Sequence, residues 1–178
     1  MEVNTLSKIE TVYFTLFNYK EWSMVIAATE NGLCYVGSQN EPIEELGKWV
    51  NKKMSRVILT ESKEKLDPFA NELMKYIDGD KNEFTQTFDL RGTSFQIDVW
   101  NTLCTIPYGK TVCYSDIAKK VGNPKAVRAV GTAIGANPIA IIIPCHRVLG
   151  KDGSLTGYSG GLPVKERLLQ LEGISYKK

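Results

Sequence analysis

The sequence has only one histidine, His146, among its 178 residues, which excludes a metal or catalytic site built from several imidazoles of one chain. It has no apolar run near the ~18 residues of a membrane-spanning helix. Its N-terminus lacks the basic-then-apolar pattern of a secretory signal. The four cysteines show no CxxC spacing, which favours reduced thiols over a disulfide framework. We therefore expect a protein without membrane contacts that stays in the cytoplasm, or in the nucleus of a eukaryote.

Charge is distributed unevenly along the chain. Residues 1–90 carry ten basic and fifteen acidic side chains, whereas residues 91–178 carry twelve basic and five acidic ones. A basic half beside an acidic half indicates an anionic partner such as nucleic acid. Lysines scattered over a solvated surface are the alternative explanation.

The first half is predicted to contain a small sheet. Segments 11–17 and 23–29 are rich in β-branched and aromatic residues, which favours strands. Asn31-Gly32 predicts a hairpin turn into a third strand over 33–37, because both residues tolerate positive φ. The alternating pattern of residues 84–90 predicts a further strand that leads into the second half.

Two helices are expected in the same half. Ile43, Leu46 and Val50 recur at helical spacing. Asp67-Pro68 is typical of a helix start, with Gly79 as the matching end. Nothing in this half gathers chemically reactive groups, so it is interpreted as a structural domain.

The second half is predicted to be mostly helical. Thr93 or Ser94 caps a first helix, which ends at Pro107-Tyr108-Gly109. Short helices over 115–121 and 124–136 are joined by a tight turn, the pattern of a helix-turn-helix. The second of them is rich in alanine and glycine, which suits close approach to another surface or close packing inside the core.

A thiol stands beside the single histidine, at Cys145-His146, after the apolar run 139–143, which is predicted to be a core strand or extended segment. A buried cysteine is usually inert, but His146 and Arg147 offer a base and a positive field that favour the thiolate. Neighbouring side chains of an extended chain point to opposite sides, so a water would relay the proton.

The imidazole needs a third group to fix its tautomer. Glu172 is the candidate, at the end of a helix whose apolar stripe is Val164, Leu168 and Leu171 and which Gly173 terminates. A solvated carboxylate is the alternative interpretation of Glu172.

Residues 91–173 resemble the O6-alkylguanine-DNA alkyltransferases, also called methylated-DNA–protein-cysteine methyltransferases. Pro144-Cys145-His146-Arg147-Val148 resembles the acceptor-site signature of that family. Five more segments match in order and spacing: the first helix (92–100), the approach to the helix-turn-helix (106–114), the recognition helix and asparagine hinge (128–138), the substrate-pocket loop (157–162) and the last helix (165–173). The first half is similar only in length and general character.

The expected fold class is α+β. We expect residues 1–88 to form a small N-terminal structural α/β domain with a sheet and helices. Residues 89–178 would form a mainly helical C-terminal domain that binds DNA through a winged helix-turn-helix-like motif and carries the alkyl acceptor.

The resemblance implies direct repair of DNA, in which the alkyl group of O6-alkylguanine passes once and irreversibly to Cys145. His146, through a water held with Glu172, would take the thiol proton. Tyr114 would donate to the ring nitrogen of the leaving guanine, and Asn137 would hold the turn that aims the active-site strand. The implied substrate pocket consists of Tyr158, Ser159, Gly160 and the carbonyls of Cys145 and Val148.

The implied partner is double-stranded DNA containing O6-alkylguanine, bound through its minor groove by a monomer that rotates the nucleotide out. Arg128 would fill the vacated stack. The expected DNA contacts are Arg128, Ala126, Ala129, Thr93, Ser94, Tyr114 and Lys125. No cofactor is expected.

No metal is expected either. Family members with a structural zinc bind it through Cys and His in the N-terminal domain, and here that domain has Cys34 and no histidine. Cys104 and Cys113 are interpreted as core thiols, with Cys113 near the helix-turn-helix open to some reactivity.

Three other functions would fit parts of the pattern. A cysteine hydrolase would use Cys145 and His146 in acyl transfer with turnover. A damage-recognition protein would rotate the alkylguanine out without repairing it, but relatives of that type lack the acceptor cysteine. A plain DNA-binding regulator would leave Tyr158, Ser159 and the Cys-His pair unexplained.

Overall fold

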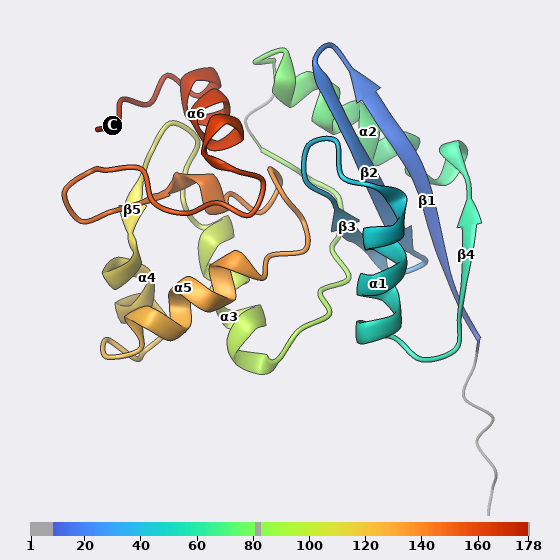
Figure 1. The fold of residues 1–178 in the computed structure, drawn as a ribbon, viewed down its shortest axis with the longest axis horizontal. Coiled ribbons are helices and arrows are strands. Elements are labelled where there is room, and N and C mark those ends of the chain that lie inside the picture. Colours follow the sequence, from blue (N-terminus) through green and yellow to red (C-terminus); the bar gives the residue numbers. More distant parts are fainter. Residues whose placement is uncertain (1–8, 81–82, 178) are drawn as a thin grey trace, which may run out of the picture.

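The computed structural model describes residues 9–80 and 83–177. A four-stranded sheet occupies the first half, in the order β3-β2-β1-β4, and a mainly helical half follows it (Figure 1). The expected α+β class is therefore confirmed. Among the described residues, no helix is long and apolar enough to cross a membrane.

The sheet is built from two antiparallel hairpins and one parallel strand. β1 (Glu10–Tyr19) pairs with β2 (Trp22–Thr29), and β2 pairs with β3 (Gly32–Val36) across the predicted Asn-Gly turn. β4 (Val57–Glu61), which the sequence analysis did not identify, lies parallel to β1.

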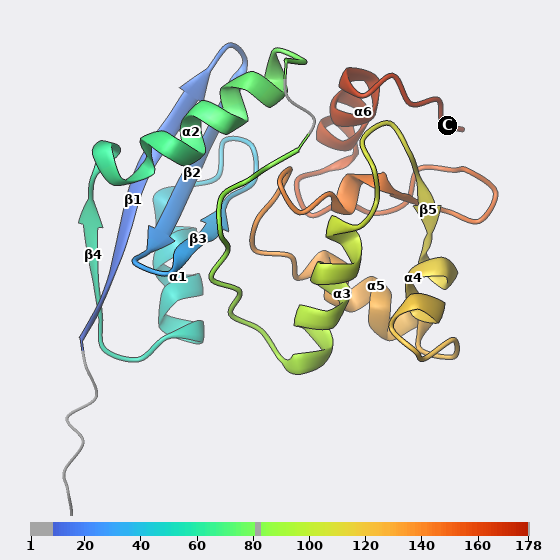
Figure 2. The same cartoon turned by 180° about the vertical axis from the view of Figure 1, so that it is seen from behind.

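Helices cover both faces of this sheet (Figures 1 and 2). α1 (Ile43–Lys53) buries Leu46 and Val50 against one face, and α2 (Lys63–Ile77) buries Leu66 and Leu73 against the other. Because both faces are covered, the central strand β2 is buried at seven of its eight positions and has an almost continuous apolar sequence.

Two predictions for this half are wrong. α2 begins at Lys63 rather than at Asp67, because the Ser62 side chain accepts a hydrogen bond from the Lys65 amide and caps the helix one turn earlier. Residues 84–90 form an extended segment with a single β-bridge, from Phe88 to Leu33, rather than a strand. The Thr85 amide donates to the Glu72 carboxylate instead of to a neighbouring strand.

The second half contains four α-helices and a short two-stranded ribbon. Thr93 caps α3, and its capping box with Gln96 confirms the predicted start. The elements are α3 (Ser94–Cys104), β5 (Val112–Cys113), α4 (Tyr114–Lys120), α5 (Val127–Gly135), the 3-10 helix η1 (Cys145–Arg147), β6 (Val148–Leu149) and α6 (Leu162–Leu171).

Two segments of this half also differ from expectation. α5 starts at Val127, not at residue 124, because a turn with a hydrogen bond from the Ala126 amide to the Asn123 carbonyl comes first. Residues 139–143 form a buried turn rather than a strand: Ile141 has φ +69°, and the Ile143 amide bonds to the Ile139 carbonyl at 3.1 Å.

The two halves share one apolar core and a backbone junction. Edge strand β3 supplies the junction: the Val36 amide donates to the Pro138 carbonyl (2.9 Å), and the Ala140 amide donates to the Val36 carbonyl (3.1 Å). The sheet thus holds the segment that leads to Cys145.

We predict opposite stability effects for alanine at two glycines. Gly32 has φ +141°, and a Cβ there would lie 2.5 Å from the Thr87 carbonyl oxygen, whereas Gly47 lies inside α1 with nothing within 4 Å of an added Cβ. Gly32→Ala should lower the free energy of unfolding by about 2 kcal/mol or more. Gly47→Ala should raise it by roughly 0.5–1 kcal/mol. Urea denaturation measures both, and equal effects would contradict this description of the hairpin.

Candidate active site

The side chain of Asn137 shapes the turn that presents Cys145. Its Nδ2 donates to the carbonyl oxygens of Ile143 (3.0 Å) and Ile139 (3.3 Å) and to Cys145 Sγ (3.3 Å), while its Oδ1 accepts from the Ile139 amide (3.0 Å). One amide therefore joins the start of the turn, its end and the sulfur. Cys145 itself is the first residue of η1, rather than part of a strand.

The imidazole of His146 is fully buried and directed at Glu172. Its Nε2 lies 2.8 Å from Glu172 Oε1, and its Nδ1 has no hydrogen-bond partner among the described residues. A carboxylate can only accept, so Nε2 carries the proton and Nδ1 presents a free lone pair. Burial lowers the pKa of His146, although the hydrogen bond to Glu172 acts in the opposite direction. The group is a neutral base.

Glu172 is a buried, ionised anchor, not a solvated carboxylate. It caps the C-terminus of α6 and is 6% exposed. Arg147 donates to both carboxylate oxygens, at 2.9 Å from Nε to Oε2 and from Nη2 to Oε1, and the Gly109 amide donates to Oε2 at 3.0 Å. Burial alone would raise the pKa of Glu172, but hydrogen bonds from His146, Arg147 and Tyr76 outweigh it and lower the pKa to about 2.

Tyr76 is the residue of this site that sequence reasoning missed. It lies on α2 in the first half, and its hydroxyl donates to Glu172 Oε1 at 2.6 Å. The same oxygen lies 3.4 Å from His146 Nε2. The first half of the chain, which the sequence analysis interpreted as a structural domain, thus contributes a polar group to this site. No local pattern could have indicated it, because Tyr76 is one of the apolar-face residues of an ordinary amphipathic helix.

The surroundings of Cys145 oppose the thiolate in the free protein. Cys145 is 4% exposed, and this burial raises its pKa, although the hydrogen bond from Asn137 and the charge of Lys165 act in the opposite direction. The Arg147 guanidinium, which was expected to favour the thiolate, is bound to Glu172 and to the Ile106 carbonyl (2.6 Å). These surroundings favour the protonated thiol, and the next residue in the chain carries a neutral base.

Lys165 is a second residue that the sequence analysis placed in a helix but did not assign to the site. Its side chain is fully buried, and Nζ donates to the carbonyl oxygens of Val148 (2.6 Å) and Thr156 (3.1 Å). Burial lowers its pKa to about 8. The lysine ties the segment after Cys145 to the loop that carries Tyr158 and Ser159.

That loop covers the sulfur. The Tyr158 hydroxyl is buried near Cys145. Gly160 allows the aromatic ring to lie close, because a Cβ there would meet Tyr158 Cε1 at 2.9 Å. Ser159 is exposed, and the Tyr114 hydroxyl lies 2.9 Å from Thr156 Oγ1.

The candidate DNA contacts lie at three helix starts, and one of them, half-buried Tyr114, is the first residue of α4. Arg128 and Ala129 are exposed on the first turn of α5, and Lys125, also exposed, and half-buried Ala126 directly precede that helix. Thr93 and Ser94 are exposed where α3 begins, with Thr93 occupied by its capping hydrogen bond.

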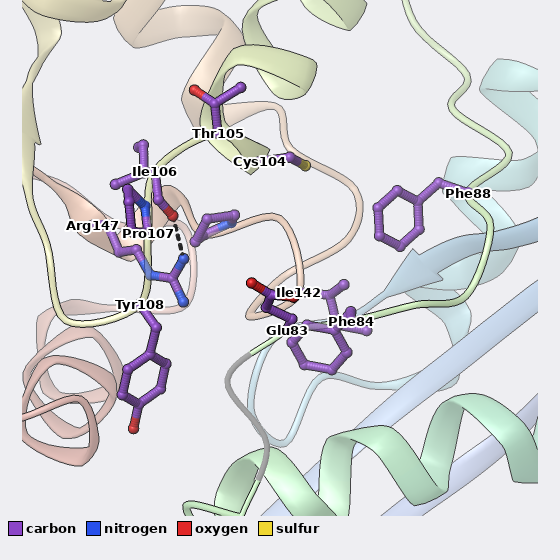
Figure 3. Close-up of a pocket in the computed structure, with 11 residues that line it drawn as sticks. Glu83, Phe84, Phe88, Cys104, Thr105, Ile106, Pro107, Tyr108, Ile142 and Arg147 are labelled. Atoms are coloured by element: carbon purple, nitrogen blue, oxygen red, sulfur yellow. Dashed lines mark hydrogen bonds between the residues drawn. The ribbon is translucent and has the colours of Figure 1, made fainter.

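A cavity of about 470 Å³ lies beside this network rather than over the sulfur. Arg147 and Tyr108 line it from the second half, together with Phe84 and Phe88 from the connecting segment (Figure 3).

Cys104 is exposed at this cavity, so its interpretation as a core thiol is wrong. Cys113 is only half-buried and donates to Asp116 Oδ2 at 2.9 Å. In the described ranges, no group of three or more metal-ligating side chains is found.

Comparisons with known proteins agree on one family. Family models described as 6-O-methylguanine DNA methyltransferase match residues 12–90 (ribonuclease-like domain) and 94–174 (DNA binding domain). An inducible methylated-DNA--protein-cysteine methyltransferase of Bacillus subtilis is 53% identical over 162 residues, 91% of this chain and 90% of that protein. A protein of the same name from Methanosarcina acetivorans is 43% identical over 91% of this chain and 99% of its own.

Solved structures give the same result. The O6-methylguanine methyltransferase of Mycobacterium tuberculosis has a TM-score of 0.76 and 38% identity, covering 90% of this chain and 92% of that one. A structure described as M. tuberculosis OGT in complex with DNA also has a TM-score of 0.76, with 39% identity over 91% and 92% of the two chains.

We predict that Glu172 makes stability depend on pH in the acid range. Its folded pKa of about 2 lies below the ordinary value of 4.5, so the folded chain binds fewer protons and loses stability as the pH falls from 4.5 to 2. The shift corresponds to about 3 kcal/mol. Glu172→Gln should remove much of this acid-range slope and, by leaving Arg147 unpaired, destabilise the protein at pH 7 by about 3–5 kcal/mol.

Urea denaturation at pH 7, 4 and 3 measures the effect. Glu44→Gln, on the exposed face of α1, serves as the control and should follow the wild type at every pH. An acid-range slope in Glu172→Gln equal to that of the wild type would contradict the assignment.

Proposed function

The chain belongs to the O6-methylguanine-DNA methyltransferase family, and we propose that it repairs double-stranded DNA by transferring the alkyl group of O6-alkylguanine irreversibly to Cys145. The observation that carries this proposal is a buried thiol followed in the chain by a neutral imidazole whose Nδ1 has no hydrogen-bond partner among the described residues. His146 offers Nδ1 as a base because its Nε2–H is fixed by the ionised Glu172.

The proposed reaction is an SN2 displacement at the alkyl carbon. His146 Nδ1 takes the thiol proton, through a water, as the sulfur attacks; the S–C bond forms while the bond from that carbon to O6 breaks. Because burial holds the sulfur protonated at rest, this transfer is required in each event. Glu172 stabilises the imidazolium that results.

The leaving guanine needs donors for its developing negative charge. We assign this role to the Tyr114 hydroxyl, directed at a ring nitrogen, and to Ser159, directed at O6. The carbonyls of Cys145 and Val148 would select the exocyclic amine of guanine, and Lys165, bound to the Val148 carbonyl at 2.6 Å, fixes that acceptor. Tyr158 would form the wall of the pocket after moving from its position near the sulfur, and Gly160 leaves room for its ring.

The product explains why each molecule acts once. An S-alkyl cysteine is a neutral thioether without an activated leaving group, so the alkyl group stays on the sulfur. The alkyl donor and acceptor are both present, so the transfer needs no cofactor.

The nucleotide must leave the stack before O6 can reach a buried sulfur. We propose that α5 lies along the minor groove, with the small residues Ala126 and Ala129 allowing close approach and Arg128 filling the vacated space. Lys125, Thr93 and Ser94 would contact phosphates with little sequence preference.

In this proposal, the protein acts as a monomer in the cytoplasm, residues 89–178 carry the reaction, and residues 1–88 support it. Repair of O4-alkylthymine by the same displacement is part of the proposal.

Intact-mass spectrometry after incubation with an O6-methylguanine duplex tests the transfer. We expect a gain of about 14 Da, one methylene, on Cys145 at one equivalent per molecule. Cys145→Ser should abolish the gain, and Cys104→Ser, at an exposed thiol, should leave it unchanged. A gain on Cys113 or release of methanol with turnover would contradict the proposal, and turnover would favour a hydrolase.

A second variant tests the role of Arg128. Arg128→Ala should slow transfer from the duplex by roughly tenfold or more, because the vacated stack is no longer filled. Transfer from the free base O6-benzylguanine, which needs no extrusion, should change far less. Equal losses with both substrates, measured as single-turnover rate constants, would contradict this role.

A further inference from the structure

The hydroxyl of Tyr76 is a polar atom that the packing of α2 does not require. The ring is fully buried and lies between Phe84, with ring centroids 5.4 Å apart, and Tyr108, edge-on at 6.1 Å. Phenylalanine would make the same ring contacts, and a buried hydroxyl costs free energy unless it is hydrogen-bonded. The position of the hydroxyl therefore needs a reason other than filling the core.

That hydroxyl meets the two groups that determine the protonation of the base. It donates to Glu172 Oε1 at 2.6 Å, and the same Oε1 accepts from His146 Nε2 at 2.8 Å. Since its proton is directed at Glu172, the tyrosine presents only lone pairs to Nε2, 3.4 Å away. Both neighbours of Nε2 are thus acceptors, which stabilises the Nε2–H tautomer and leaves Nδ1 free.

We propose that Tyr76 is a positioning residue of the transfer reaction, which completes a Tyr76–Glu172–His146 network and gives the first half of the chain a part in the chemistry. This inference rests on the proposed function. Tyr76 acts through the carboxylate and does not touch the alkyl group or the guanine.

Tyr76 and His146 bond to the same oxygen of Glu172, Oε1, and this shared acceptor affects the basicity of His146. A donor on Oε1 draws electron density from the carboxylate and weakens its attraction for a proton on the imidazole. Without the hydroxyl, Glu172 would stabilise the imidazolium more strongly and raise the pKa of His146. The base would then be protonated, and unable to accept from the thiol, at a higher pH than in the wild type.

Other charges at the site are fixed by their own partners. The titratable groups around His146 and Glu172 are Arg147, Lys165, Tyr76 and Tyr108, and Cys145 precedes His146 in the chain. Arg147 donates to Glu172 and to the Ile106 carbonyl, Lys165 donates to two carbonyls, and Tyr108 donates to the Leu171 carbonyl (3.1 Å). Burial keeps the pKa of Tyr76 well above its ordinary value, so it remains a donor at every pH of interest.

Tyr76→Phe tests the proposal through the pH dependence of the single-turnover rate constant with an O6-methylguanine duplex. We expect the acid limb of the profile to move to higher pH by about 0.5–1 unit. The plateau should fall about threefold to tenfold, less than the ~100-fold or greater effect of losing a general base.

Tyr35→Phe is the matched control. Tyr35 is likewise a buried tyrosine of the first half whose hydroxyl donates to a glutamate carboxylate, Glu41, at 2.8 Å, but its ring packs in the separate core cluster with Leu46 and Val50. This variant should lose stability comparably and keep the wild-type acid limb.

A second measurement does not depend on activity. His146 is the single histidine of the chain, so ¹⁵N-histidine NMR of the protein without a histidine tag follows its titration without assignment. The titration midpoint should lie higher in Tyr76→Phe than in the wild type and in Tyr35→Phe.

The outcomes separate the inference from the proposed function. If neither the acid limb nor the histidine titration midpoint moves in Tyr76→Phe, the proposed role of Tyr76 is overturned. This holds even if the rate constant falls, because a loss of packing alone would lower the rate constant without moving either readout. A wild type that takes up no alkyl group would overturn the proposed function, and the titration in the two variants would still decide whether Tyr76 tunes His146.

Discussion

The buried carboxylate of Glu172 is the interaction on which the site depends. It ends α6 and accepts hydrogen bonds from His146 and Arg147 of η1, from the Gly109 amide after α3, and from Tyr76 of α2. An ionised group can be buried only when it is fully paired, so the elements that supply these donors must meet at one place. Both halves of the fold therefore contribute to the position of the His146 imidazole.

Burial gives this site a defined resting state. The thiol of Cys145 is held protonated and the imidazole of His146 neutral, because the surroundings disfavour a charge on either. In the proposed single-use reaction this state protects the nucleophile, since a protonated and covered sulfur is a poor target for other electrophiles. Asn137, Lys165 and the loop with Tyr158 form the surroundings of the sulfur.

Local patterns predicted much of the fold and indicated the proposed reacting pair. The Asn31-Gly32 hairpin, the Thr93 cap and the Gly173 helix end each depend on neighbouring residues and were found correctly. Glu172 was a candidate by helix position and family resemblance. Tyr76 lies 70 residues from His146 and 96 from Glu172, and its helix has an ordinary apolar face, so its contact arises only from tertiary packing.

Other misses have equally physical causes. The apolar run 139–143 has the composition of a strand, but beyond a single bridge from Ile139 to β3 it forms a turn, which the side chain of Asn137 holds. Arg147 was expected to act on the thiol, and only the structure shows that Glu172 binds it.

The most direct test of the whole account is the ¹⁵N spectrum of His146 in the free protein at pH 7. A neutral ring protonated at Nε2 is predicted, and an imidazolium or an Nδ1–H tautomer would contradict it.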